Sequence, residues 1–125
     1  KLIRQDLRYY ENKIDQQNGP AMSYAIFAVQ YARMQEPEKA YQMFLKSFVP
    51  HERPPFGVLA ETPTSQNPYF MTGAGGLLQA VLFGFGGLTI DEDGIRQLPS
   101  SLPSHWKSLT LKGIGPDRKT FVCTH

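Results

Sequence analysis

The sequence predicts a fold that is mainly helical at first and β-stranded at its end. Three observations support this prediction. Apolar residues recur at intervals of three and four up to about residue 83, the period shortens to two after residues 86–87, and two turn-like segments follow. Helices followed by strands are typical of an α+β fold or of two domains. We place the boundary after Gly87, so that residues 1–87 form a helical part and residues 88–125 a β part.

The helical part begins with two helices of different character. Residues 1–15 alternate apolar and charged positions at helical spacing, which predicts an amphipathic helix. Asn18-Gly19-Pro20 predicts a turn, and proline suits the first turn of a following helix over residues 21–34. This second helix has almost no polar face, which is typical of a helix in the interior of a larger protein.

Two further helices flank a long proline-rich segment. Glu36 and Glu38 favour the start of a helix over residues 36–49, because carboxylates stabilise its positive end. Residues 50–71 carry five prolines, which exclude a long regular element, while their apolar side chains argue against disorder. A fourth helix is expected over residues 72–83, again apolar on most sides. Two such helices are more than a chain of 125 residues buries alone.

The β part is predicted from two turns and the strands beside them. Residues 88–90, followed by Asp91-Glu92-Asp93-Gly94, indicate a strand and a turn. Residues 108–114 and 119–124, joined by a Gly-Pro-Asp-Arg turn, indicate a β-hairpin.

Charge and length exclude two classes of partner. Thirteen Lys and Arg residues against eleven Asp and Glu residues give a net charge of +2, and the basic residues are scattered. We therefore expect no nucleic-acid partner and no membrane partner. The longest apolar run, residues 77–88, is shorter than the roughly 20 residues of a membrane helix. The chain begins with Lys1, and we expect that the rest of the same protein lies upstream of it.

The sequence also gives no pattern for a metal ion or a cofactor. The single Cys123 excludes an internal disulfide framework and a multi-cysteine zinc site, but it leaves the cellular compartment open. The three histidines share no metal-ligand spacing. Gly73-Ala74-Gly75-Gly76 lacks both the dinucleotide-binding spacing and the phosphate-loop lysine, so we interpret these glycines as points of close approach to a neighbour or a neutral ligand.

Glu61 is the candidate catalytic residue. No charged residue occurs from Thr62 to Ile90, so Glu61 is the last carboxylate before a long apolar stretch. Apolar surroundings disfavour the ionised form of a carboxyl group, which is one way to tune a general acid or base. Glu61 could equally cap a backbone amide or form an ion pair with Arg53, and the residues alone do not decide between these interpretations.

Several motifs together resemble glycoside hydrolase family 65. The resemblance lies in Gly19-Pro20-Ala21-Met22, Ala60-Glu61-Thr62-Pro63, the run from Phe70 to Val81, Gly84-Phe85-Gly86-Gly87-Leu88, and Leu98-Pro99 to Leu102-Pro103 with Trp106. It covers essentially the whole chain. The family comprises hydrolases of disaccharides such as trehalose and kojibiose, a glucosidase for glucosylgalactosyl-hydroxylysine, and disaccharide phosphorylases, all several times longer than this chain.

The resemblance implies a particular fold and mechanism. It implies that residues 1–87 are the last helices of an (α/α)6 barrel and that residues 88–125 are the first antiparallel strands of a β-sandwich domain. Members invert the anomeric centre, using a carboxylic acid on one side of the bond and water or phosphate on the other. The matching acid would lie upstream of Lys1, so the isolated chain is expected to be inactive.

The same resemblance favours hydrolysis over phosphorolysis. Phosphorylases of the family carry a serine pair and a Gly-Ile-His element that hold phosphate, and residues 19–22 and 69–73 depart from both. Ala60-Glu61-Thr62-Pro63 is similar to the segment that carries the general base of the hydrolases. Water needs a base to accept its proton, whereas phosphate is already anionic. The resemblance thus makes Glu61 the general base of an inverting α-glucoside hydrolase.

Other predictions depend on the same loop. Gln66, Asn67 and Tyr69 are candidate sugar-binding residues because they follow Glu61 closely in sequence. The expected partner is a small-molecule disaccharide or glucoside, with no cofactor and no metal ion. Two alternatives remain: a fragment of a disaccharide phosphorylase, and a non-catalytic module that binds carbohydrate or only packs against a neighbour.

Overall fold

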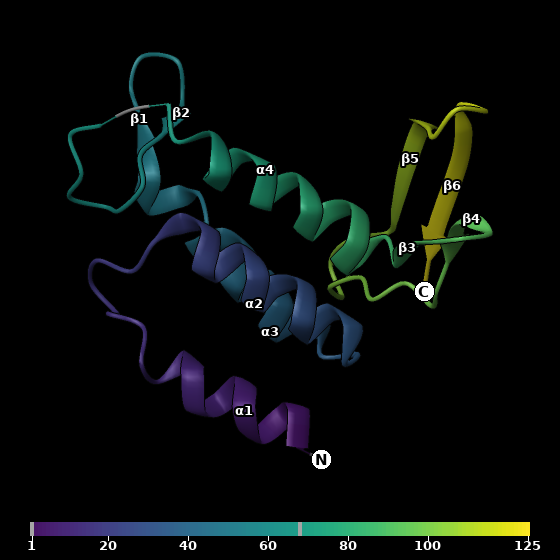
Figure 1. The fold of residues 1–125 in the computed structure, drawn as a ribbon, viewed down its shortest axis with the longest axis horizontal. Coiled ribbons are helices and arrows are strands. Elements are labelled where there is room, and N and C mark those ends of the chain that lie inside the picture. The colour runs from purple at the N-terminus through teal and green to yellow at the C-terminus, as the bar shows by residue number, and fades with distance from the viewer. Residues whose placement is uncertain (1, 68) are drawn as a thin grey trace.

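The computed structural model describes residues 2–67 and 69–125 and contains helices and small antiparallel sheets (Figure 1). Its elements are α1 (Leu2–Glu11), α2 (Ala21–Arg33), α3 (Pro37–Lys46), a 3₁₀ turn η1 (Val49–His51), β1 (Glu52–Arg53), β2 (Val58–Leu59), α4 (Met71–Gln79), a π-helical turn η2 (Ala80–Phe85), β3 (Leu88–Asp91), β4 (Gly94–Gln97), β5 (Ser108–Ile114) and β6 (Lys119–Thr124). Lys1, predicted in the first helix, and Pro68, predicted in the proline-rich segment, lie outside the described residues.

The strands form three two-stranded antiparallel sheets, β1–β2, β3–β4 and β5–β6. The predicted order of helices before strands is confirmed, except that the short β1–β2 pair precedes α4. The predicted hairpin is confirmed with the same bounds, and Ser108 pairs with Thr124 at its open end.

Helix α2 is the centre of the helical part, between α3 and the α4–η2 segment (Figure 1). Seven of its thirteen residues are buried: Ala21, Tyr24, Ala25, Phe27, Ala28, Tyr31 and Ala32. A helix without a polar face needs neighbours on several sides, and here α3 and α4 supply them. The predicted neighbours are therefore present on the sides that α3 and α4 cover, whereas Ile26 of α2 is 47% exposed.

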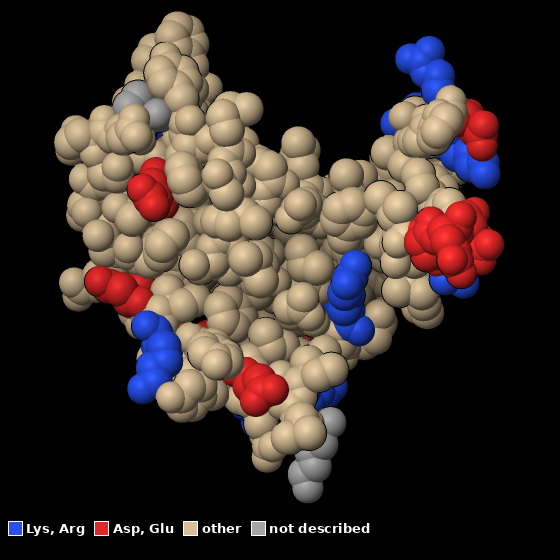
Figure 2. All heavy atoms as spheres, in the orientation of Figure 1, with Lys and Arg blue, Asp and Glu red and all other residues tan. Residues whose placement is uncertain are grey.

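Helix α4 is buried on one side only. Gly73 and Gly76 are its buried residues, whereas Met71 and Leu78 on the other side are 76% and 62% exposed. A Cβ atom on Gly76 would lie 2.5 Å from Sδ of Met22 and 2.9 Å from Cβ of Ala25. The glycines therefore let α4 approach α2 closely. Figure 2 shows that the surface over α2 and α4 has few charged side chains, which lie mainly at its margins.

Helix α1 ends at Glu11, earlier than the predicted residue 15. The Asp15 carboxylate accepts hydrogen bonds from the backbone N–H groups of Gln17 (2.9 Å) and Asn18 (3.1 Å), which forms a turn that competes with the helix. Glu11 ties α1 to the bundle, because its carboxylate accepts hydrogen bonds from Lys39 Nζ (2.8 Å) and from the Tyr31 hydroxyl. Burial alone would raise the pKa of Glu11, but these two donors outweigh it and lower the pKa.

Aromatic side chains join the helices to the β part. The Phe85 ring lies 5.4 Å from that of Phe44 in α3 and 5.0 Å from that of Trp106, measured between centroids. Beside this cluster, Cys123 of β6 is buried and accepts a hydrogen bond from Gln97 Nε2 of β4 (3.1 Å). Its thiol also donates to the backbone oxygen of Gly86 (3.6 Å). The β5–β6 hairpin is thus anchored on the end of η2.

Candidate functional site

Glu61 lies just after β2, on a segment that crosses the start of α2. Its backbone oxygen accepts a hydrogen bond from the N–H of Ala21, the first residue of α2, at 2.9 Å. This bond satisfies one of the N–H groups that a helix leaves without a partner at its N-terminus. The N–H of Ala60 donates to the backbone oxygen of His51, also at 2.9 Å. The backbone of residues 60–61 is therefore fixed between η1 and α2.

The Glu61 side chain is exposed, and its carboxylate has no hydrogen bond or ion pair to any residue that the structure describes. The ion pair with Arg53 that the sequence left open is not formed. Instead, Nη2 of Arg53 donates to the backbone oxygens that follow Glu61, those of Thr62 (3.2 Å), Pro63 (2.6 Å) and Ser65 (3.3 Å). Both carboxylate oxygens are consequently able to accept a proton or a hydrogen bond from a ligand.

Asn18 also holds the same segment. Its Oδ1 atom accepts hydrogen bonds from the backbone N–H of Thr64 (3.2 Å) and from the Thr64 hydroxyl (2.7 Å). Asn18 belongs to the turn that precedes α2, so this contact spans 46 residues of sequence. Residues 61–65 are thus bound both to the turn before α2 and to Arg53 of β1.

His51 lies beneath the Glu61 segment and is fully buried. Neither ring nitrogen has a well-oriented hydrogen-bond partner among the described residues. Burial lowers the pKa of His51, and the nearby charge of Arg53 acts in the same direction, while backbone groups of Ala60, Lys46 and Glu61 act against it. The imidazole is therefore neutral at pH 7.

The other three predicted site residues are exposed on the chain that leads from Glu61 to α4. Gln66 and Asn67 lie on the surface, and the backbone N–H of Asn67 donates to Ser65 Oγ at 3.2 Å. Tyr69 is 69% exposed and has a φ of 67°, in the left-handed region that non-glycine residues rarely adopt.

Tyr69 lines a groove of about 270 Å³ together with Phe48, Glu52 and Leu59. Glu61, Gln66 and Asn67 are not among the residues that line this groove. The structure therefore places the four predicted residues on one segment without gathering them around one cavity.

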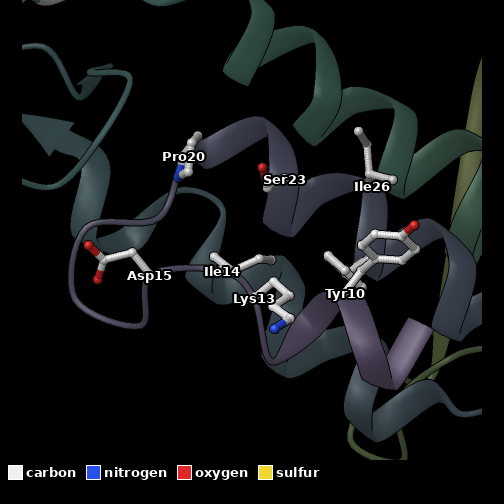
Figure 3. Close-up of a pocket in the computed structure, with 8 residues that line it drawn as sticks. Tyr10, Lys13, Ile14, Asp15, Pro20, Ser23 and Ile26 are labelled. Carbon is white, nitrogen blue, oxygen red and sulfur yellow. The ribbon is translucent and has the colours of Figure 1, made fainter. Parts of the chain in front are cut away.

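A second cavity, of about 400 Å³, lies between α1 and α2 (Figure 3). Tyr10 and Ile14 line it from α1 and the following turn, and Pro20, Ser23 and Ile26 line it from the start of α2. None of the four predicted site residues lines it, and its lining is mostly apolar. It offers no converging set of polar groups for a substrate.

Residues 2–67 and 69–125 lack two further features. This part of the chain holds no group of three His, Cys, Asp or Glu side chains close enough to bind a metal ion. It also holds no helix with the length and apolar content required to cross a membrane.

Sequence reasoning did not identify Arg53 and Asn18 as residues that fix the Glu61 segment. Arg53 was considered only as an ion-pair partner, and Asn18 only as a turn residue. Both bind atoms that are nine or more residues away, so no local spacing could reveal the contacts.

Comparison with known proteins was made over the whole chain. No family model matches it. The chain is 52% identical over 124 residues to a kojibiose hydrolase of Flavobacterium johnsoniae and 49% identical over 120 residues to one of Mucilaginibacter mallensis, covering 98% and 96% of this chain. It is 34% identical over 118 residues to a protein-glucosylgalactosylhydroxylysine glucosidase of Dictyostelium discoideum, covering 94% of this chain and 16% of that protein. A kojibiose phosphorylase of Thermoanaerobacter brockii is 29% identical over 111 residues.

These similarities define the class of the protein: the chain is homologous to enzymes that act on glycosides. These relatives are of the glycoside hydrolase family 65 type that the sequence motifs resemble. The chain spans 18% of the length of the two kojibiose hydrolases, so it corresponds to one segment of such proteins.

Proposed function

We propose that this chain is part of an inverting hydrolase of α-linked glucosides and that Glu61 is its general base. The observation that carries the proposal is the identity of about 50% to two kojibiose hydrolases over nearly the whole chain. The geometry of Glu61 supports it, because an exposed carboxylate without a protein partner stands on a segment whose backbone is held at both ends. The substrate class is a disaccharide or another small α-glucoside.

In the proposed reaction, Glu61 accepts a proton from water as the water oxygen bonds to the anomeric carbon. The bond from that carbon to the leaving oxygen breaks, and a carboxylic acid outside this chain protonates the leaving oxygen. In inverting enzymes the two carboxyl groups are about 6.5–9.5 Å apart, which leaves room for the water. Because only one of the two groups is in this chain, the isolated chain is expected to be inactive.

The fold proposal follows from the exposed side of α4. We assign residues 1–87 to the last helices of an (α/α)6 barrel and residues 88–125 to the first strands of a β-sandwich domain. The outer face of α4 supports this assignment, since Met71 and Leu78 are exposed on a helix that carries no charged residue. The chain matches only 18% of the length of the two kojibiose hydrolases. Most of the length of such proteins therefore lies outside the matched segment and is available to cover this face.

Gln66, Asn67 and Tyr69 are proposed to contact the sugar. The two amides are exposed and able to bond hydroxyl groups, and the exposed phenol ring of Tyr69 offers a flat apolar surface to a pyranose ring.

The test replaces Glu61 by Gln in the full-length protein that contains this chain. We expect turnover of kojibiose to fall by about 10² to 10⁴-fold, the usual contribution of a positioned general base. Glu92→Gln is the matched control, because Glu92 is an exposed glutamate on the β3–β4 turn, and it should leave turnover unchanged. Near-normal hydrolysis by the Glu61→Gln protein would sink the assignment.

The relationship to a kojibiose phosphorylase makes phosphorolysis the second candidate reaction. Release of glucose 1-phosphate that depends on added inorganic phosphate would favour it over hydrolysis. Calorimetric binding of kojibiose by the full-length protein, without any turnover, would instead favour a non-catalytic carbohydrate-binding role.

A further inference from the structure

We infer that Arg53 is a positioning residue for Glu61, an inference that rests on the proposed role of Glu61 as general base. A single guanidinium group binds the backbone of the loop that follows Glu61. Nη2 of Arg53 donates to the carbonyl oxygens of Thr62, Pro63 and Ser65, which are the first, second and fourth residues after Glu61. Arg53 therefore contacts the segment that directly follows the candidate base.

The guanidinium is itself held in place by its own strand region. Nη1 of Arg53 donates to the backbone oxygens of Pro50 (3.3 Å) and Glu52 (3.0 Å). The guanidinium is a planar fork with two terminal nitrogens. Nη1 binds residues 50–52 and Nη2 binds residues 62–65, so Arg53 links these two stretches of chain. Hydrogen bonds from a charged donor are about twice as strong as those between neutral groups.

The loop is also bound by α2 and by the turn before it. The N–H of Ala21 donates to the Glu61 oxygen, and Asn18 accepts two hydrogen bonds from Thr64. With the Arg53 contacts and these two contacts together, the backbone at Glu61 has little freedom to shift. A displacement of about 1 Å in a reacting group is enough to reduce turnover about 10²-fold.

The arrangement also leaves the Glu61 carboxylate without a protein partner among the described residues while its backbone is held. A direct ion pair with Arg53 would stabilise the charged carboxylate and occupy one of its oxygens, and both effects would weaken it as a proton acceptor. Arg53 instead makes its hydrogen bonds to carbonyl oxygens, and no ion pair from it to a carboxylate occurs among the described residues. The segment is fixed through its backbone, while the carboxylate stays available to water.

The experiment compares Arg53→Met and Arg53→Lys with Glu61→Ala in the full-length enzyme. Lysine keeps the charge but has no planar fork to reach several carbonyls at once. We expect both Arg53 variants to lower kcat for kojibiose by at least about 10-fold with little change in KM, Met more than Lys. Arg33→Met is the matched control, because the exposed Arg33 donates to the Phe83 oxygen (3.4 Å) far from the loop, and it should leave kcat unchanged.

Sodium azide separates a positioning role from a merely structural one. Azide is already anionic, so it bonds to the anomeric carbon without a base, while the leaving oxygen takes its proton from the acid outside this chain and glucosyl azide forms. We expect azide to raise turnover of the Arg53→Met, Arg53→Lys and Glu61→Ala proteins but not that of the unmodified enzyme.

Other outcomes would overturn either the role of Arg53 or the proposed function. Wild-type kcat in both Arg53 variants, with Glu61→Ala inactive, would overturn the inference and leave the proposed function intact. A loss of kcat in Arg53→Lys that azide does not restore would also overturn it, because the damage would then extend beyond the base. Near-normal turnover of Glu61→Ala would overturn the proposed function itself. If Arg53→Met fails to fold, Arg53→Lys decides the question alone.

Discussion

The Glu61 segment and helix α4 meet the same residue, Ala21, but they are held against it by different forces. The Glu61 oxygen accepts a hydrogen bond from the Ala21 N–H at 2.9 Å, and further polar contacts fix the residues that follow. A Cβ atom on Gly73 of α4 would lie 3.1 Å from Cβ of Ala21, so the helix contact depends on the absence of a side chain. The position of the loop therefore depends on hydrogen-bond donors and on protonation, whereas the contact of the helix depends on side-chain volume.

The largest expected effect is on the close contact between α4 and α2. Gly76→Ala puts a Cβ atom 2.9 Å from Cβ of Ala25, whose position is set by the α2 backbone. We expect the free energy of unfolding of the chain to fall by about 1–3 kcal/mol, as overpacked cores generally show. Urea unfolding measures this change. An unchanged midpoint would indicate that α4 is able to move away from α2 and that their contact does not depend on side-chain volume.

The next effect concerns the pH dependence of stability that arises from His51, beneath the Glu61 segment. Because the pKa of His51 is lowered in the folded state below its ordinary value of 6.5, the unfolded state binds a proton first as the pH falls. Stability is therefore complete above about pH 6.5 and declines below it, by at most about 1.4 kcal/mol per pH unit.

Replacing His51 by Phe tests this pH dependence. The variant removes the titrating group from beneath Ala60 and Glu61, so thermal unfolding between pH 7 and pH 5 should become less dependent on pH than in the unmodified chain. An identical slope in both proteins would assign the pH dependence to another group.

The smallest expected effect concerns the exposed side of α4. A Cβ atom on Gly75 would meet nothing within 4 Å, because Gly75 lies on the exposed side of the helix. Gly75→Ala should therefore raise the stability of the isolated chain by about 0.5–1 kcal/mol through helix propensity. In the full-length protein, where we propose that barrel neighbours cover this face, the gain should disappear or reverse. A gain of equal size in both would contradict a covered face.

Much of the fold was predictable because its signals are local. Pro20 and Pro37 mark the starts of α2 and α3, and the turn at residues 115–118 fixes the hairpin whose strands were predicted with their observed bounds. The contacts of α2 with neighbours on more than one side were also indicated by its missing polar face. The position of Glu61 on an irregular segment beside apolar packing was predicted as well.

The rest depends on very short elements, on a local side-chain turn and on contacts between distant residues. The two-residue strands β1 and β2 are too short to show an alternating pattern, and α1 ends early because the Asp15 side chain binds nearby backbone N–H groups. The contacts of Arg53 and Asn18 form only after the loop folds onto α2. Sequence spacing cannot anticipate such contacts, because a carbonyl oxygen at any position is an equally good acceptor.

The reactivity of Cys123 reports how firmly the C-terminal hairpin is attached to the helices. Cys123 is the one cysteine of the sequence, and it is buried between β4 and the end of η2. Burial raises the pKa of its thiol, although the hydrogen bond from Gln97 opposes this, so the closed form reacts slowly with alkylating reagents. The rate of alkylation therefore reports how often β5–β6 separates from the helices, in a chain that needs no engineered label.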